Sequence, residues 1–560
     1  MAERDDKRPS PRLNRRDFVA SALAAGALAS LPACARRGPP PFVEQTVFRI
    51  SPVAPFERDD ATIADLQAAM RDGKTTSRSL VERYLSRIAA ADRGDRGVNA
   101  VLEANPDALA IADALDAERK TKGARGPLHG IPILIKDNIA TADRMQTTAG
   151  SLALVGATPE RDAFVAERLR AAGAVLLGKT NLSEWANFRS THSSSGWSAR
   201  GGQCRNPYAL DRTPSGSSSG SAVAVAANFC AAAVGTETDG SIVSPAASCS
   251  VVGIKPTVGL VSRSGIIPIA HSQDTAGPMA RAVADAAALL TALAGVDARD
   301  AATAESAGRA SADYTKFLDA DGLRGARIGV PREQLFGTSA ATDALIDDAL
   351  TLMRQRGAEI VDPAPLTLGQ GAGDAEFEVL LYEFKADLNA YLAELGAPAG
   401  ARSLEELIAF NERHRAEEMP YFGQEIFVMA QKKGPLTEAA YREALAKSKR
   451  LARDEGIDAT MDKFKLDAIV APTRRTPPSL IDLVNGDPSG GGSSRPAAVA
   501  GYPHVTVPAG YVRGLPVGIS FFGRAWSEPT LIRLAYAFEQ ASKRRRAPTF
   551  APTANLASKA

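Results

Sequence analysis

Cysteine and histidine are scarce in this chain, which limits the chemistry available to it. The 560 residues include four cysteines and five histidines. No group of them has the spacing of a zinc site, so no metal is predicted. The cysteines are too few and too dispersed for a disulfide framework: Cys34, Cys204, Cys230 and Cys249. Cys230 and Cys249 are predicted to be small core residues, and the sequence leaves open whether one disulfide joins two of the last three.

An excess of charge of one sign is also lacking. The formal net charge is +2. A local basic cluster at 543–546 follows an amphipathic pattern, which is typical of a solvated helix end, so nucleic acid is not predicted as a partner. The Gly-rich stretch 486–492 lacks the Gly-Lys-Ser/Thr of a phosphate-binding loop, and no cofactor is predicted. Nothing in the sequence indicates an oligomeric state.

Long apolar runs are absent except for one near the N-terminus, at 19–33. This run is too short and too rich in alanine for a confident membrane span. It follows the pair Arg15-Arg16, and residues 1–34 resemble a twin-arginine export signal. The segment ends in Leu-Pro-Ala-Cys, which resembles a lipoprotein cleavage box. Both lipidation of Cys34 with membrane anchoring and ordinary cleavage nearby stay open, and we expect an exported protein, either periplasmic or a membrane-anchored lipoprotein.

The rest of the chain reads as one large soluble domain, with 45% hydrophobic and 23% charged residues. Helical and strand patterns alternate along it, which is typical of an α/β fold. Helices are predicted at 62–70, 77–91, 162–172, 221–228, 283–293 and 530–541, and strands at 131–135, 174–177, 231–234, 327–330, 359–361, 466–471, 505–507 and 516–522. We divide the chain into an export signal (1–34), a linker (35–60), a domain (61–550) with an internal linker (295–323) and a helical cover (about 373–453), and a tail (551–560).

What the chain does contain is two runs of small residues, Gly216–Ser221 and Gly235–Ser241, downstream of an isolated lysine, Lys136. A serine hydroxyl becomes a nucleophile only with a base, and a lysine can be that base only when it is neutral. Lys136 ends the apolar run 131–135, where desolvation would disfavour its ammonium form. The second run offers consecutive backbone N–H groups for a developing oxyanion, at Thr238, Asp239, Gly240 and Ser241.

Taken singly, these motifs are ordinary, because Gly-Ser runs are usually loops and a lysine at a strand end is usually solvated. Together with further motifs at 130–132, 178–181 and 253–259, they resemble the amidase signature family of Ser-Ser-Lys amide hydrolases over about residues 63–550. The resemblance implies one α/β domain whose mixed central sheet is covered by helices on both faces.

The resemblance also assigns roles to individual residues. It makes Ser241 the nucleophile, Ser217 a bridging serine with a cis peptide bond to Gly216, and Lys136 the base. The two serines are 24 residues apart, as the family requires. In the implied mechanism the lysine draws a proton through Ser217 from Ser241, which attacks an amide carbonyl to form an acyl-enzyme.

The first run of small residues also allows a second interpretation. Residues 216–220 also fit the Gly-x-Ser-x-Gly nucleophile elbow, which would make Ser218 the nucleophile of an esterase. An elbow follows a core strand, whereas 205–215 reads as loop. Its base would have to be a histidine after Ser218, and the candidates are His271, His414 and His504. Otherwise Gly216 and Ser218 are possible substrate-loop residues.

Two details narrow the branch of the family. Val243 stands where many members have an arginine, and the motifs at 181–188 and 196–203 are similar to those of bacterial peptide amidases. Such enzymes remove the C-terminal carboxamide of small amidated peptides as ammonia, and other carboxamides or aryl amides stay open as substrates. A glutaminyl amidotransferase subunit would need partners and a cytosolic address, and an inactive binding homologue would be expected to lose one residue of the triad.

Overall fold

The computed structural model describes residues 60–555, except 95, 368, 370 and 489–490. All of these residues belong to one compact unit of the chain. The predicted export signal with Cys34, the linker up to residue 59 and the last five residues of the tail lie outside the described residues. Among the described helices, none has the length and apolar character needed to cross a membrane.

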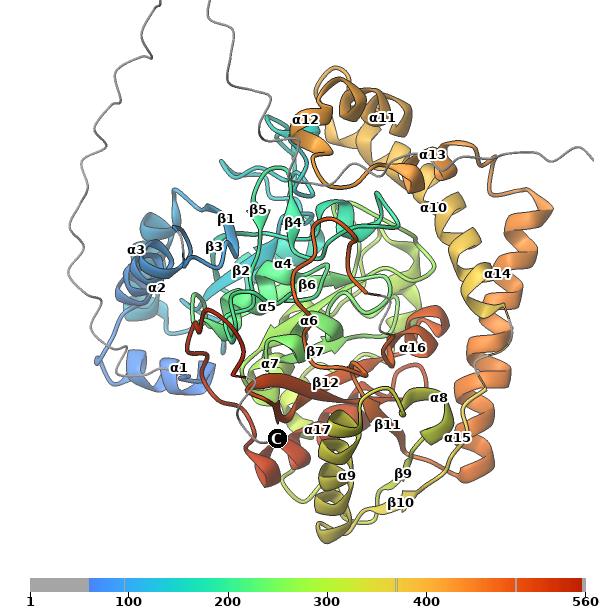
Figure 1. The fold of residues 1–560 in the computed structure, drawn as a ribbon. Coiled ribbons are helices and arrows are strands. Elements are labelled where there is room, and N and C mark those ends of the chain that lie inside the picture. The colour runs from blue at the N-terminus through green and yellow to red at the C-terminus, as the bar shows by residue number, and fades with distance from the viewer. Residues whose placement is uncertain (1–59, 95, 368, 370, 489–490, 556–560) are drawn as a thin grey trace, which may run out of the picture. The chain divides into compact units, whose positions relative to one another are not determined.

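A mixed sheet of 11 strands forms the centre of the fold (Figure 1). Parallel pairs join β2 to β3 and β6, and β9 to β10 and β11, while the pairs between these two groups are antiparallel. In spatial order the strands are β1 (Val101–Ala104), β3 (Val175–Thr180), β2 (Pro132–Lys136), β6 (Ala232–Glu237), β8 (Thr275–Ala280), β7 (Val252–Lys255), β12 (His504–Val512), β13 (Leu515–Phe522), β11 (Ala468–Pro472), β9 (Arg327–Gly329) and β10 (Glu359–Val361). A small separate sheet pairs β4 (Trp197–Ser198) with β5 (Gly202–Gln203).

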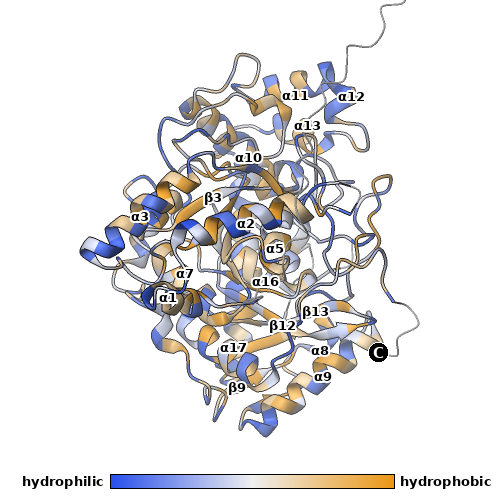
Figure 2. Ribbon diagram, turned by 90° about the vertical axis from the view of Figure 1, so that its left-hand side faces the viewer, coloured by the Kyte–Doolittle hydropathy of each residue, from blue (hydrophilic) through white to orange (hydrophobic). Residues whose placement is uncertain are grey.

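Helices lie along both faces of this sheet (Figure 1). They are α1 (Ile63–Arg71), α2 (Ser77–Ala91), α3 (Ala108–Lys122), α4 (Phe164–Ala171), α5 (Ser219–Ala226), α6 (Val243–Ser248), α7 (Val283–Leu293), α8 (Arg332–Leu335), α9 (Ala340–Gln355), α10 (Ala372–Leu395), α11 (Leu404–Arg413), α12 (Arg415–Glu418), α13 (Glu425–Gln431), α14 (Ala439–Ala452), α15 (Asp458–Phe464), α16 (Ser494–Ala500) and α17 (Glu528–Ser542). In Figure 2, surface helices such as α2 and α9 carry both hydrophobic and hydrophilic residues, as amphipathic helices against a core do.

Helices cover both faces of the sheet because alternate residues of the central strands are apolar on both faces. Successive strand side chains point to opposite faces. In β2, Ile133 and Ile135 pack into one core with residues of α4, α7 and α17, whereas Leu134 packs into a second core with residues of α2, α3 and α5. All five residues of β2 are buried. Up to Ile135 the strand therefore reads as an apolar run, which is typical of a parallel strand buried on both sides, and Lys136 is its one polar residue.

Most predicted elements are confirmed. The helices at 77–91 and 283–293 have the predicted bounds, and the predicted helical cover is present as α10 to α14. The cover has a core of its own, shared with Trp185 and Phe188 of the motif at 181–188. The predicted internal linker contains two short 3₁₀ helices, Ala301–Ser306 and Tyr314–Phe317. Cys204, Cys230 and Cys249 are buried free thiols, so none of these three forms a disulfide with another.

Candidate active site

Neighbouring strands bring the lysine and the serine runs together. β2 pairs in parallel with β6, with Ile135 opposite Val234, so the two strands end at the same edge of the sheet. Lys136 is the last residue of β2, and the turn that carries Ser241 follows the end of β6. The open edge formed by the carboxyl ends of parallel strands is where ligands bind in α/β sheets.

Lys136 is fully buried at this edge and faces a serine. Its Nζ lies 2.8 Å from Ser217 Oγ and 2.8 Å from Thr236 Oγ1. Burial lowers the pKa of Lys136 to about 7, against the opposing effect of the Asp274 and Glu237 carboxylates. A large fraction of the amine is therefore neutral near pH 7, as a proton acceptor must be.

Two other buried lysines show that burial alone does not make such a site. Burial also lowers the pKa of Lys179 and of Lys255, each to about 8. However, Lys179 Nζ donates to the Ile139 carbonyl at 2.6 Å and to Thr147 Oγ1 at 2.8 Å, and Lys255 Nζ donates to the Pro256 carbonyl at 3.1 Å. Among the described residues, neither amine donates to the two serine runs, whereas the Lys136 amine contacts one hydroxyl group in each run, those of Ser217 and Thr236.

The segment before Ser217 is shaped by close packing. The peptide bond between Gly216 and Ser217 is cis, as predicted. A Cβ atom on Gly216 would collide with Ser183 Oγ, so a larger residue would force the Ser183 side chain to move. The Ser183 N–H in turn donates to the Ser217 carbonyl at 3.1 Å, which fixes the orientation of the Ser217 backbone toward the lysine.

Ser218, the nucleophile of the rival interpretation, is bound to the backbone of β6. Its Oγ donates to the Thr236 carbonyl at 3.0 Å and accepts the Thr236 N–H at 3.1 Å. Its N–H donates to the Ser241 carbonyl at 3.1 Å, joining the two serine runs. The three histidines that the elbow would need pair with other groups: His271 with Asp387, His414 with Phe410 and His504 with Ser520.

The turn that carries Ser241 is held by a buried carboxylate. Glu237 Oε2 accepts the N–H groups of Ile242 at 2.7 Å and of Val243 at 3.0 Å. Gly240 has φ 81°, a left-handed conformation that favours glycine. Within the part of the chain that the structure describes, the N–H groups of Asp239, Gly240 and Ser241 donate to no protein acceptor. The sequence predicts these three N–H groups, together with that of Thr238, as donors to a developing oxyanion, and that role stays a prediction.

A cavity of about 640 Å³ borders both serine segments. Gly216 lies on one side of it and Gly240 on another, and Ser241, with 8% of its surface exposed, is more accessible than the fully buried Ser217. The start of α10 and the end of α14 contribute to the wall, as does the Gly-rich loop at 486–492. The helical cover therefore shapes a cleft next to the predicted nucleophile.

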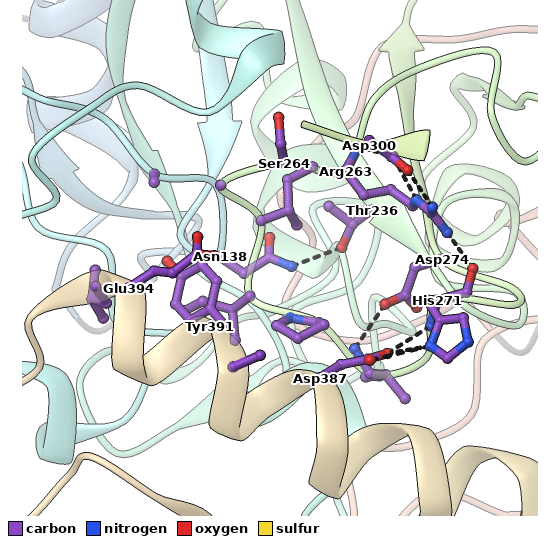
Figure 3. A pocket seen from close by; sticks show the side chains of 18 of the residues that line it. Asn138, Thr236, Arg263, Ser264, His271, Asp274, Asp300, Asp387, Tyr391 and Glu394 are labelled. Carbon is purple, nitrogen blue, oxygen red and sulfur yellow. Dashed lines mark hydrogen bonds and ion pairs between the residues drawn. The ribbon is translucent and has the colours of Figure 1, made fainter. Parts of the chain in front are cut away.

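A second cavity of about 900 Å³ lies against the partners of the lysine (Figure 3). Its wall includes Asn138, whose Nδ2 donates to Thr236 Oγ1 at 3.0 Å. It also includes Thr238, whose hydroxyl donates to Asp274 at 2.5 Å. Burial raises the pKa of Asp274 to about 6, so this carboxylate is mostly charged at pH 7 and acts on Lys136 through space.

One group of side chains has the geometry of a metal site. His271, Glu383 and Asp387 offer ligand atoms within 4.8 Å of one another. Burial alone would lower the pKa of His271, but the hydrogen bond to Asp387 and the charge of Glu383 outweigh it and raise the pKa. The contacts of the imidazole with the Asp387 and Glu383 carboxylates account for the group without an ion. The residues are too far apart in the sequence for spacing to have indicated it.

Sequence reasoning missed three residues around Lys136: Thr236 and Asp274, which act on its amine, and Asn138, which bonds to Thr236. Thr236 lies inside the second small-residue run and Asn138 is two positions after the lysine, but neither is a charged or nucleophilic residue that stands out. Asp274 lies in a segment that carries no predicted motif. Only the pairing of β6 with β2 and with β8 places these side chains around the amine.

The fold and the site define an amide-hydrolysing α/β enzyme. Residues 79–532 match the family model described as Amidase, and the chain belongs to this family. A probable amidase from Arabidopsis thaliana is 44% identical over 504 residues, 88% of this chain and 92% of that protein.

Solved structures agree with this assignment. The native peptide amidase from Stenotrophomonas maltophilia has a TM-score of 0.83 and 54% identity, covering 89% of this chain and 100% of that one. A structure of the peptide amidase PAM in complex with the competitive inhibitor chymostatin has a TM-score of 0.85 and 55% identity, covering 88% and 100%. The resemblance found in the sequence, including the peptide amidase branch, is thus confirmed.

Proposed function

We propose that this enzyme removes the C-terminal carboxamide of small amidated peptides as ammonia. The observation that carries the proposal is the buried Lys136 amine, 2.8 Å from Ser217 Oγ beside the turn of Ser241. The similarity to peptide amidases supports a peptide as the acyl part of the substrate. The cavity of about 640 Å³ has the size of a cleft for a small molecule.

In the proposed mechanism the proton moves along three residues. Neutral Lys136 accepts the proton of Ser217 as Ser217 accepts that of Ser241, and Ser241 Oγ attacks the amide carbonyl carbon. The N–H groups of residues 238–241 stabilise the oxyanion of the tetrahedral intermediate. When this intermediate collapses, the C–N bond breaks and the relay returns the proton to the nitrogen, which leaves as ammonia. Water then attacks the acyl ester of Ser241 and releases the acid.

The proposal predicts ammonia release from a C-terminally amidated dipeptide. We expect turnover of the amide and none of the same dipeptide as the free acid, because the free acid has only an internal peptide bond to offer. Ammonia is measured with a coupled assay, and mass spectrometry shows whether the dipeptide acid is the product. Free amino acids among the products would contradict the restriction to the terminal carboxamide, and an inactive enzyme would contradict the proposal.

We further propose export through the N-terminal signal, on the basis of the Arg15-Arg16 pair and the apolar run after it. Replacing both arginines by lysine is expected to leave the full-length precursor inside the cell, because the twin-arginine signal is read as an address. Fractionation with an antibody to the domain checks this. Cys34→Ala is the matched variant: if it moves the enzyme from the membrane to the soluble fraction, the cysteine is the anchor. Export of the double lysine variant at the normal rate would refute the twin-arginine assignment.

A further inference from the structure

Arg474 contacts both segments that carry the predicted catalytic serines. It follows the end of β11 and lines the cavity of about 640 Å³. Its Nη1 donates to Ser215 Oγ at 2.8 Å and to Ser244 Oγ at 3.2 Å. Ser215 is two residues before Ser217, and the Ser244 N–H donates to the Gly240 carbonyl at 2.8 Å. The guanidinium therefore lies where the two serine segments meet the cleft.

This guanidinium has no carboxylate partner. Among the described residues, no acidic oxygen lies within 4.0 Å of the Arg474 nitrogens, and its Nε is buried without an acceptor. Burial lowers the pKa of Arg474, with Asp487 opposing. Leaving a donor of a charged group unpaired away from water is costly. The Nε atom itself is closed to the cleft, but the Arg474 side chain lines the cavity. An acceptor that enters the cleft would therefore offset part of the cost of a guanidinium without a carboxylate partner.

Among the other described arginines of the cleft, Arg495 is balanced by carboxylates, whereas Arg475 has no carboxylate partner and its Nε, like that of Arg474, is buried without an acceptor. Arg495 pairs with Glu376 at 2.9 Å and lies 3.8 Å from Asp239, and Arg475 donates to the Gln334 carbonyl. Asp487 lines the same cavity as Arg474. With a carboxylate already in the cleft, the acceptor that suits Arg474 is a neutral carbonyl oxygen rather than a second anion.

We infer that Arg474 is a specificity-determining residue that donates to the main-chain carbonyl oxygen preceding the amidated residue of a bound peptide. The inference rests on the proposed function, because it concerns the acyl side of that substrate. Val243 stands where many members of the family have an arginine. Arg474 reaches Ser244, the neighbour of Val243, from a segment 230 positions later and brings a cation to this side of the cleft.

The inference makes peptide amides better substrates than simple amides. An amide without an acylamino group cannot supply the carbonyl and would leave Arg474 with only its two serine hydroxyl partners. The matched pair of substrates is N-acetyl-phenylalaninamide and 3-phenylpropanamide, which share the carboxamide and the phenyl group. We expect Arg474→Gln to lower the ratio of their kcat/KM values by about tenfold to a hundredfold, as loss of a hydrogen bond to a charged group does.

Two further variants separate substrate binding from support of the fold. Arg474→Lys keeps the charge but loses the planar fork of donors, and an intermediate ratio is expected. Arg524→Gln changes an arginine outside the cleft that pairs with the Asp458 and Asp462 carboxylates, and should shift the ratio less than threefold. If Arg474→Gln slows both substrates equally, Arg474 is only a tether between the serine segments, and the inference is wrong.

Binding gives a test that needs no turnover. In the Ser241→Ala background, calorimetry with N-acetyl-phenylalaninamide should show at least a tenfold higher Kd when Arg474 is also replaced by glutamine. Equal Kd values in folded variants, judged by circular dichroism and Tm, would overturn the inference. An inactive wild-type enzyme that still shows the Kd difference would contradict the proposed function and leave the role of Arg474 supported.

Discussion

Ser241→Ala is expected to reduce ammonia release from an amidated dipeptide by at least about 10³-fold, as removal of a nucleophile does in other serine hydrolases. The variant keeps the turn, because Glu237 holds the backbone N–H groups after it and not the serine hydroxyl. It should therefore fold and bind substrate. The measurement is kcat on the amidated dipeptide, with calorimetric binding as the check on the cleft.

Ser218→Ala is the matched control, because it removes a hydroxyl from the other serine run. Its hydrogen bonds to the Thr236 backbone are structural, so we expect weakened activity and a lower Tm rather than loss of turnover. The nucleophile elbow predicts the opposite ranking of the two variants. Full activity in Ser241→Ala would exclude this serine as the nucleophile.

The fold was predictable wherever burial leaves a local pattern. β2 was found because its residues before Lys136 are apolar and buried, and α2 was found because its apolar residues recur at helical spacing. β8 was not predicted, since Gly277 and Pro278 are typical of loops. The structure explains the glycine: a Cβ there would collide with the Ile254 carbonyl of the neighbouring strand β7.

β12 is longer than the sequence predicts, again because it contains proline and glycine. The predicted strand covers 505–507, whereas β12 continues to Val512 past Pro508 and Gly510. The pairing with β13 is irregular between these two residues, and such an irregularity accommodates proline and glycine within a strand. The predicted strand therefore ended at Val507, because proline and glycine disfavour strands locally. In the structure, pairing with β13 continues the strand beyond them.

Some residues of the candidate site could be predicted from the sequence and others could not. Lys136, Ser217 and Ser241 were predicted because short motifs carry them. Thr236 and Arg474 were not, because their contacts with Lys136 and Ser215 join positions 100 and 259 residues apart. A pattern of residue types along one chain does not contain that information; the order of strands in the sheet supplies it.

The pKa of Lys136 predicts how the rate depends on pH. Its folded-state pKa is lowered to about 7, and only the neutral amine accepts a proton, so the active fraction is high above pH 7 and falls below it. We expect kcat/KM on the amidated dipeptide to decline about tenfold per pH unit well below pH 7. Lys136→Met should lower the rate by about 10²- to 10⁴-fold. A wild-type rate that stays flat between pH 5 and pH 8 would contradict a lysine base, provided the chemical step limits the rate.

Asp274→Asn tests whether the acid limb belongs to Lys136. The Asp274 carboxylate raises the pKa of the lysine against the effect of burial, so removing its charge should move the midpoint of the acid limb to lower pH. Lys179→Met is the control, because Lys179 is equally buried but contacts neither serine run, and its loss should leave the midpoint in place. If Asp274→Asn leaves the midpoint unchanged, a group other than Lys136 sets the pH profile. Glu376 is one such group, since burial raises its pKa to about 8.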